Sequence, residues 1–334
     1  MGGNDVNGND VDGPEKAGAG QSGADVRTGD AAADCLIVGG GPAGLTAAIY
    51  LGRFHRSAIV VDADEGRLSL IPTSHNHPGY PGGVHGCDLL ADMRVQARRY
   101  GADLRAGEVT KVIRDGDVFT AETTAGAVRA RTVLLATGVV NLRPPVEPHA
   151  HDAAVAAGQL RYCPICDAFE QTGRRIGVLG LDRHGLAEAM FLRTYSDDVV
   201  VLALAAPDLD EDAREQARSA GIAIEEVPVS SFDFDADDVG LTLDDGRTLR
   251  VDTLYAALGS RTRNDLGEAL GTELSGNQCF VTDAHQRCSV PGVYAAGDAV
   301  EGLDQISCAM GTAARAAVAI HNDLRKADGE VLQD

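Results

Sequence analysis

Residues 34–51 read DCLIVGGGPAGLTAAIYL, and this stretch decides the fold. The apolar run before the glycines is typical of a buried parallel strand, and the apolar residues after them favour a helix. Gly39, Gly41 and Gly44 lie between the two in Gly-x-Gly-x-x-Gly spacing. In that context they permit a tight turn, a close backbone approach to a pyrophosphate and close helix–strand packing. The phosphates would sit at the helix N-terminus, beside Pro42 and Ala43.

An acidic residue follows the next strand at the expected place. Residues 58–61 form a second apolar run, which ends at Asp62, 18 positions after Gly44. A carboxylate there can accept a hydrogen bond from a ribose hydroxyl. Glycine loops alone are weak signals, but strand, turn, helix and acid together predict a dinucleotide-binding α/β domain.

A weak internal repeat indicates a second layer of the same kind. Residues 175–180 form another strand and glycine turn, and residues 199–202 form the strand that would follow its helix. Residues 254–259 then resemble residues 134–138. We therefore expect two similar nucleotide-binding layers in one chain.

A cysteine pair precedes the second layer. Cys163 and Cys166 are separated by two residues, and Asp167 follows directly. Cys-x-x-Cys is a common redox pair, and a helix start would lower a thiol pKa there. Half of a zinc site and a static disulfide are the alternatives. Zinc would need a second pair at ligand spacing, which the chain lacks, and a static disulfide suits secreted proteins.

Composition excludes several classes of partner. The 334 residues carry a net charge of −21, and only three of the 29 basic residues are lysine. So acidic a chain repels nucleic acid and anionic lipid. There is no apolar run of 18 residues and no signal peptide, and seven scattered cysteines fit a reducing cytoplasm, so we expect a cytoplasmic protein without a membrane segment. The acidic, lysine-poor composition indicates either a protein adapted to high salt or a bias in genomic composition.

Several motifs together carry a family resemblance. Besides the first glycine loop and the cysteine pair, the chain has Asn76-His77-Pro78-Gly79, a second small-residue turn at 136–138, the run 293–298 and Gln305-Ile306. In this order they resemble the low-molecular-weight thioredoxin reductase family of FAD-dependent disulfide oxidoreductases. The resemblance covers essentially all of residues 34–325.

The resemblance implies an α/β fold of two Rossmann-like, three-layer ββα domains, the second inserted into the first. The expected parts are an FAD-binding domain at 34–143 and 263–325, a central NAD(P)-type domain at 144–262, a disordered acidic tail at 1–33 and a C-terminal tail at 326–334. The residues expected to bind FAD are Gly39, Gly41, Pro42, Ala43, Gly44, Asp62, Asn76, Thr137, Gly138, Gly297, Asp298, Gln305 and Ile306. No metal site is expected, although His75 and His77 lie close in sequence.

The family pattern also assigns roles. Cys166 would face the flavin, Cys163 would exchange with the substrate disulfide, and Asp167 would be the acid or base. The substrate would be a thioredoxin-like protein or a small-molecule disulfide or dithiol. Members are commonly homodimers, so a homodimer is expected.

Departures from the family leave the electron partner open. Asp182 stands where the second loop should have a glycine against the pyrophosphate, and residues 203–205 read Ala-Leu-Ala where arginines should hold the 2′-phosphate of NADPH. Asp208 and Asp210 add negative charge, and Arg183 could offset only part of the loss. NADPH use is therefore doubtful. An oxygen-dependent dithiol oxidase, a ferredoxin-linked thioredoxin reductase and a binding or sensing flavoprotein are the alternatives.

Overall fold

The computed structural model describes residues 32–234 and 237–331. The acidic tail expected at 1–33 falls almost wholly outside these described residues. Its last residue, Ala33, already begins the first strand. Among the helices in the described ranges, none combines the length and the apolar character needed to cross a bilayer.

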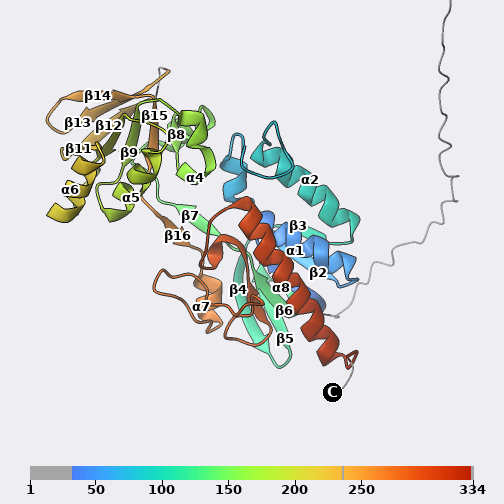
Figure 1. Ribbon diagram of the computed structural model, residues 1–334. Coiled ribbons are helices and arrows are strands. Elements are labelled where there is room, and N and C mark those ends of the chain that lie inside the picture. The colour runs from blue at the N-terminus through green and yellow to red at the C-terminus, as the bar shows by residue number, and fades with distance from the viewer. Residues whose placement is uncertain (1–31, 235–236, 332–334) are drawn as a thin grey trace, which may run out of the picture. The chain divides into compact units, whose positions relative to one another are not determined.

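The first sheet joins parallel strands to an antiparallel hairpin (Figure 1). β1 lies between β2 and β6, and β17 returns from near the end of the chain to pair in parallel with β6. The strands of this sheet are β1 (Ala33–Val38), β2 (Ala58–Asp62), β3 (Asp103–Ala106), β4 (Val109–Asp115), β5 (Val118–Thr123), β6 (Val128–Leu135) and β17 (Val293–Ala295).

Both faces of β1 are buried, as its continuous apolar sequence predicts. Cys35 and Ile37 pack among the helices, whereas Leu36 and Val38 pack with residues of the hairpin β4–β5. The helices on the first side are α1 (Pro42–Arg53), α2 (Gly86–Arg99) and α8 (Ile306–Ala327). This lobe therefore has a helix layer, a parallel sheet and a β layer.

The second lobe repeats these layers around another parallel sheet, in the order β11–β10–β9–β15–β8. Its strands are β8 (Leu160–Arg161), β9 (Ile176–Leu179), β10 (Val199–Leu202), β11 (Ala223–Glu225) and β15 (Thr253–Ala256). Val178 and Val201 pack beside residues of the helices α5 (Arg183–Leu192) and α6 (Glu211–Ser219). Leu179 and Leu202 pack against the antiparallel strands β12 (Val229–Asp233), β13 (Val239–Leu243) and β14 (Thr248–Val251).

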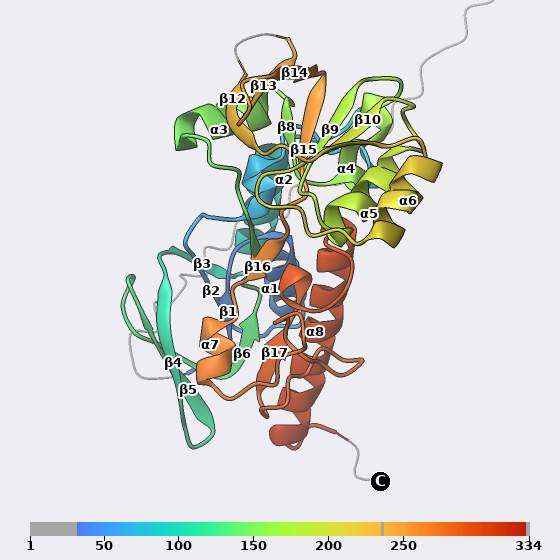
Figure 2. The same cartoon turned by 90° about the vertical axis from the view of Figure 1, so that its left-hand side faces the viewer.

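Two short strands connect the lobes. β7 (Val139–Asn141) leaves the first lobe, β16 (Ser260–Thr262) returns to it, and the two pair antiparallel (Figure 1). Figure 2 shows β16 between the lobes from a second direction. The remaining helices are α3 (Pro148–Ala156), α4 (Pro164–Asp167) and α7 (Asp265–Ala269). The α/β class, with one Rossmann-like unit inserted into another, agrees with the prediction from sequence.

Candidate active site

The first glycine loop has the shape that a dinucleotide requires. At Gly44 a Cβ would lie 1.9 Å from the carbonyl oxygen of Gly39, so helix and strand meet only because residue 44 has no side chain. At Gly41 a Cβ would meet nothing within 4 Å. Gly41 is also the N-cap of α1, no side chain caps this end, and Pro42 occupies the first turn. The N–H groups of the first turn therefore have no side-chain cap, and the open space at Gly41 beside them fits the pyrophosphate of FAD.

The expected FAD-binding segments converge on this loop. A Cβ at Gly40 would lie 2.4 Å from Oδ2 of Asp62, and one at Gly39 would lie 2.4 Å from the carbonyl oxygen of Ala136, next to Thr137. A Cβ at Gly297 would lie 2.9 Å from the Cβ of Ala43. The ends of β2, β6 and β17 thus meet at the N-terminus of α1, where open α/β sheets bind ligands.

The hydrogen-bond partners of these residues could not be read from the sequence. Arg94 on α2 donates to Asp62 over 3.1 Å. The hydroxyl of Thr137 donates to the backbone carbonyl of Arg263. The backbone N–H of Arg263 donates to the carbonyl of Gly138. The hydroxyl of Thr312 on α8 accepts from the N–H of Gly297.

Asp298 lies in a charged cluster. Arg67 donates to Asp298 over 3.2 Å and to Asp304 over 2.8 Å. Burial, helped by the like charge of Asp304 and opposed by Arg67, raises the pKa of Asp298 to about 6. Sequence reasoning named Asp298 but missed Arg67 and Asp304.

Cys163 and Cys166 form a disulfide at the start of α4. Cys163 is the N-cap residue, Pro164 is in the first turn, and the N–H of Cys166 donates to the carbonyl of Cys163 over 3.0 Å. Among the free cysteines, burial raises the pKa of Cys35 and of Cys288 to about 12, which makes both poor nucleophiles.

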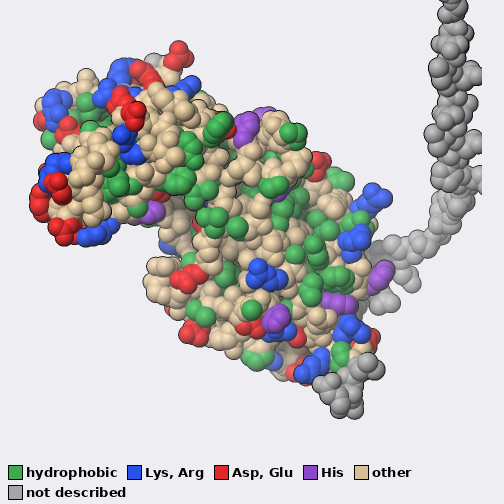
Figure 3. Space-filling view, in the orientation of Figure 1, with side chains coloured by type: hydrophobic (Ala, Val, Ile, Leu, Met, Phe, Trp, Pro, Cys, Tyr) green, Lys and Arg blue, Asp and Glu red, His purple; other side chains and the backbone are tan. Residues whose placement is uncertain are grey.

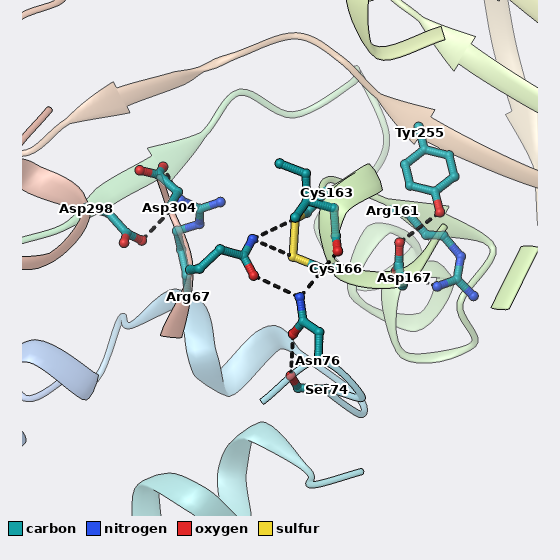
Figure 4. Close-up of a disulfide and its surroundings, with 12 residues drawn as sticks. Arg67, Ser74, Asn76, Arg161, Cys163, Cys166, Asp167, Tyr255, Asp298 and Asp304 are labelled. Atoms are coloured by element: carbon teal, nitrogen blue, oxygen red, sulfur yellow. Dashed lines mark hydrogen bonds and ion pairs between the residues drawn. A yellow bond between two sulfur atoms is a disulfide. The ribbon is translucent and has the colours of Figure 1, made fainter. Parts of the chain in front are cut away.

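Two residues of the first lobe contact the loop that carries the disulfide (Figure 4). Gln305, the N-cap of α8, donates through Nε2 to the sulfur of Cys163 over 3.4 Å and to that of Cys166 over 3.3 Å. Asn76 donates through Nδ2 to Gln305 Oε1 over 2.9 Å and to the carbonyl of Ile165 over 3.3 Å. The sequence placed Asn76 and Gln305 at the cofactor. The structure adds direct contacts between these side chains and the redox loop.

Asp167 points away from the disulfide in the same view. Its carboxylate accepts from the hydroxyl of Tyr255 over 2.8 Å and pairs with Arg161, which also donates to Thr253. Burial raises the pKa of Asp167, and the positive charge of Arg161 together with the hydrogen bonds from Tyr255 and Arg161 only partly opposes this. The structure therefore brings Asp167 together with Arg161 and Tyr255, and not with the sulfurs.

The second glycine loop differs physically from the first. Asp182 is the N-cap of α5, and its carboxylate accepts from the N–H of Gly185 over 2.8 Å. Arg183 pairs with Asp210, which itself caps α6 by accepting from the N–H of Ala213. The helix end that could receive a pyrophosphate already has a carboxylate, and the nearby arginine already has an acidic partner.

Comparisons with known proteins agree on one family. The family model described as pyridine nucleotide-disulphide oxidoreductase matches residues 33–313. The thioredoxin reductase of Streptomyces coelicolor is 30% identical, covering 85% of this chain and 91% of its own length. That of Aquifex aeolicus is 29% identical, covering 80% and 86%. Among solved structures, HlmI is similar with a TM-score of 0.83 at 28% identity, covering 90% of this chain and 94% of its own.

Proposed function

This chain belongs to the pyridine nucleotide-disulphide oxidoreductase family and is an FAD-dependent thiol–disulfide oxidoreductase of thioredoxin reductase type, and we propose that its Cys163–Cys166 pair exchanges electrons with a thioredoxin-like protein or a small-molecule disulfide. The position of the disulfide carries this proposal. Its two sulfurs contact Gln305, at the N-terminus of α8, in the lobe that has the open glycine loop.

The proposed division of the chain follows the two lobes. Residues 34–143 and 263–325 would bind FAD, and residues 144–262 would carry the cysteine pair. The open turn at Gly41 and the convergence of Asp62, Thr137 and Gly297 on α1 support this division. When bound, FAD would supply a two-electron carrier for the cysteine pair.

The two cysteines would have different roles. In the reduced enzyme, the thiolate of Cys163 attacks one sulfur of the substrate disulfide, forms a mixed disulfide and releases the other substrate sulfur as a thiolate. Cys166 then attacks the sulfur of Cys163 and releases the second substrate thiolate, which closes the disulfide of the enzyme. Ile165 and Phe169 are 48% and 76% exposed beside the pair, which supports docking of an apolar partner surface.

Trapping the mixed disulfide tests these roles. Cys166→Ser should accumulate a mixed disulfide through Cys163, because the resolving thiol is missing. Cys163→Ser should not. Mass spectrometry after incubation with an oxidised thioredoxin, or with a small disulfide, distinguishes the two substrates. Equal trapping by both variants would contradict the assignment.

Asp167 is proposed as the acid or base of the exchange. Its raised pKa favours a carboxyl that can hold a proton nearer neutral pH. To act at a sulfur it must leave Arg161, because its carboxylate is bonded to Arg161 and Tyr255. Asp167→Asn should therefore slow exchange and remove one limb of the pH–rate profile, and an unchanged profile would exclude the role.

The electron partner is proposed to be other than NADPH. The carboxylate of Asp182 at the start of α5 and the ion pair between Arg183 and Asp210 both support this. Anaerobic mixing with NADPH, NADH or reduced ferredoxin, followed by the visible spectrum, identifies a donor. Air oxidation of a dithiol with uptake of oxygen would identify a dithiol oxidase instead. Rapid reduction at micromolar NADPH would overturn the proposal.

A cytoplasmic homodimer is the proposed assembly. Tyr50 on α1, Val95 on α2 and Val318 on α8 are 40%, 65% and 42% exposed. Hydrophobic side chains also gather over α2 and α8 on the face shown in Figure 3. An apolar surface of this kind suits a subunit contact. Light scattering coupled to gel filtration should give twice the chain mass, and Val95→Glu with Val318→Glu should give the chain mass.

A further inference from the structure

Three polar side chains of the first lobe form a chain of hydrogen bonds that ends on the disulfide. The hydroxyl of Ser74 donates to Asn76 Oδ1 over 3.1 Å. Asn76 Nδ2 donates to Gln305 Oε1, and Gln305 Nε2 donates to the sulfurs of Cys163 and Cys166 (Figure 4). Each amide therefore uses its oxygen on one neighbour and its nitrogen on the next.

This arrangement fixes the direction of the Gln305 amide. An amide can turn its oxygen or its nitrogen toward a partner, and only the surrounding hydrogen bonds decide which. The carbonyl of Ile165 can only accept, so it holds the Asn76 amide with its nitrogen toward Ile165 and Gln305. Nδ2 of Asn76 can only donate, so it faces the oxygen of Gln305. The nitrogen of Gln305 then has to face the sulfurs. A sulfur that gains negative charge at this position would find an N–H already directed at it.

We propose that Gln305 is a catalytic residue that stabilises the thiolate of the reduced pair, and that Asn76 and Ser74 are positioning residues that hold its amide in the donating orientation. The inference rests on the proposed function and adds a role for residues otherwise assigned to the cofactor. Two-electron reduction breaks the S–S bond and leaves two sulfurs, and bound FAD would supply the electrons. One takes up a proton and the other remains a thiolate beside Nε2 of Gln305.

Nε2 of Gln305 lies at nearly the same distance from both sulfurs of the pair. Because Nε2 lies 3.4 Å from one sulfur and 3.3 Å from the other, the same N–H can follow the charge when it moves between Cys163 and Cys166. Such a donor lowers the thiol pKa without adding a charge of its own. The charged side chains drawn near the pair in Figure 4 are Arg67, Asp298, Asp304, Arg161 and Asp167. Glu170 lies near Asp167, and His77 contacts Ser307 on the first turn of α8. The substitutions of Gln305 and Asn76 below keep all of these groups.

The test is the pH dependence of thiol alkylation in the FAD-loaded protein. The protein is reduced with dithiothreitol under argon, freed of reductant and reacted with iodoacetamide between pH 5 and pH 10. Mass spectrometry then gives the rate at each cysteine. Gln305→Leu should raise the apparent pKa of the more acidic thiol by about one unit, because a hydrogen bond to a charged group is lost. Ser307→Ala, on the same turn of α8, is the matched control and should leave the profile unchanged.

A double-mutant comparison separates positioning from general damage. Asn76→Ala should raise the same pKa by less than Gln305→Leu, because the amide can then turn its oxygen to the sulfurs for part of the time. In the Gln305→Leu background, Asn76→Ala should add no further shift, since Asn76 acts only through Gln305. Additive shifts would overturn the positioning role of Asn76.

A second substitution covers the case in which Gln305→Leu loses FAD or fails to fold. Gln305→Glu keeps the size of the side chain but presents only acceptors when ionised, so it should raise the thiol pKa by more than one unit. Profiles of wild type and Gln305→Glu that coincide would overturn the inference. The titration needs neither the disulfide substrate nor the physiological electron donor, because dithiothreitol reduces the pair, so failure of the proposed function in turnover assays would not affect this result.

Discussion

Asp298 follows β17 as a half-buried carboxylate that shares Arg67 with Asp304. Its pKa of about 6 lies above the ordinary 3.8, so the folded protein binds this proton more tightly than the unfolded chain does. The contribution to stability is complete below about pH 4 and is lost as the pH rises through about 6. At neutral pH the ionised Asp298 therefore opposes folding of the FAD-free protein.

Asp298→Asn should remove this penalty. We take the free energy of unfolding of the variant minus that of wild type, both in FAD-free protein. This difference should be about 2–3 kcal/mol larger at pH 8 than at pH 4. Urea denaturation at the two pH values measures it. Asp117→Asn, at an exposed hairpin tip, serves as the control for the loss of one acid. A variant with the same pH dependence as wild type would show that burial of Asp298 does not perturb its titration.

At the scale of elements, two glycines of the turn between β1 and α1 have different roles: Gly41 leaves room for the cofactor, and Gly44 lets the helix pack against the strand. Ala fits Gly41 without strain, since the backbone φ is −75° and the space is open, yet its Cβ would enter the region that fits the pyrophosphate. At Gly44 a Cβ would overlap the carbonyl of Gly39. Gly41→Ala should therefore fold normally and lose flavin, whereas Gly44→Ala should lose about 1–3 kcal/mol of stability or more. Flavin absorbance per chain and urea midpoints measure both, and a yellow Gly41→Ala protein would exclude this loop as the pyrophosphate site.

The start of α5 should respond to substitution in two separable ways. Asp182→Ala removes the N-cap and should cost about 1 kcal/mol, whereas Asp182→Gly should cost only a few tenths. Both variants open the helix end, and the glycine also lets a pyrophosphate approach, so Asp182→Gly should speed flavin reduction by NADH in stopped flow. NADPH should improve only when Leu204→Arg and Ala205→Arg are added.

Glu147→Ala is the matched control for loss of a cap. Glu147 caps α3 by accepting from the N–H groups of His149 and Ala150, in another part of the second lobe. This variant should lose stability without any change in the response to nucleotides. If Asp182→Gly behaves in the same way as Glu147→Ala, the carboxylate of Asp182 is not what limits nucleotide binding.

The sequence predicted those features whose physical cause lies within a short stretch of the chain. Gly39, Gly41 and Gly44 lie within six residues of one another, so their spacing alone predicts the strand, the turn and the helix. The contact between Asn76 and Gln305 joins residues 229 positions apart, and that between Arg67 and Asp304 joins residues 237 apart. No local pattern announces such pairs, because only the folded sheets bring them together. Asp182 was recognised as an obstacle, but its role as a helix cap became evident only from the structure.

At the scale of the whole molecule, the charge of −21 should make stability depend on salt. Two effects compete. Salt weakens exposed ion pairs such as Arg218 with Glu211 and Glu215, because water and ions screen both partners. It also screens the repulsion among acids in excess of the basic partners, because the Debye length falls from about 10 Å at 0.1 M to about 3 Å at 1 M. Because the 50 acidic residues outnumber the 29 basic ones, we expect the relief of repulsion to exceed the loss of ion pairs.

The melting temperature should therefore rise between 0.1 M and 2 M potassium chloride. Removing exposed acids should reduce the rise, and Glu108→Gln, Asp92→Asn and Asp117→Asn together provide that comparison, since all three side chains are exposed. Salts also strengthen apolar burial in any protein, but that effect should be equal in wild type and the triple variant. The difference between the two slopes of melting temperature against salt concentration therefore isolates the contribution of surface charge. Parallel slopes would mean that surface repulsion contributes nothing measurable, and a melting temperature that falls with salt would mean that the ion pairs dominate.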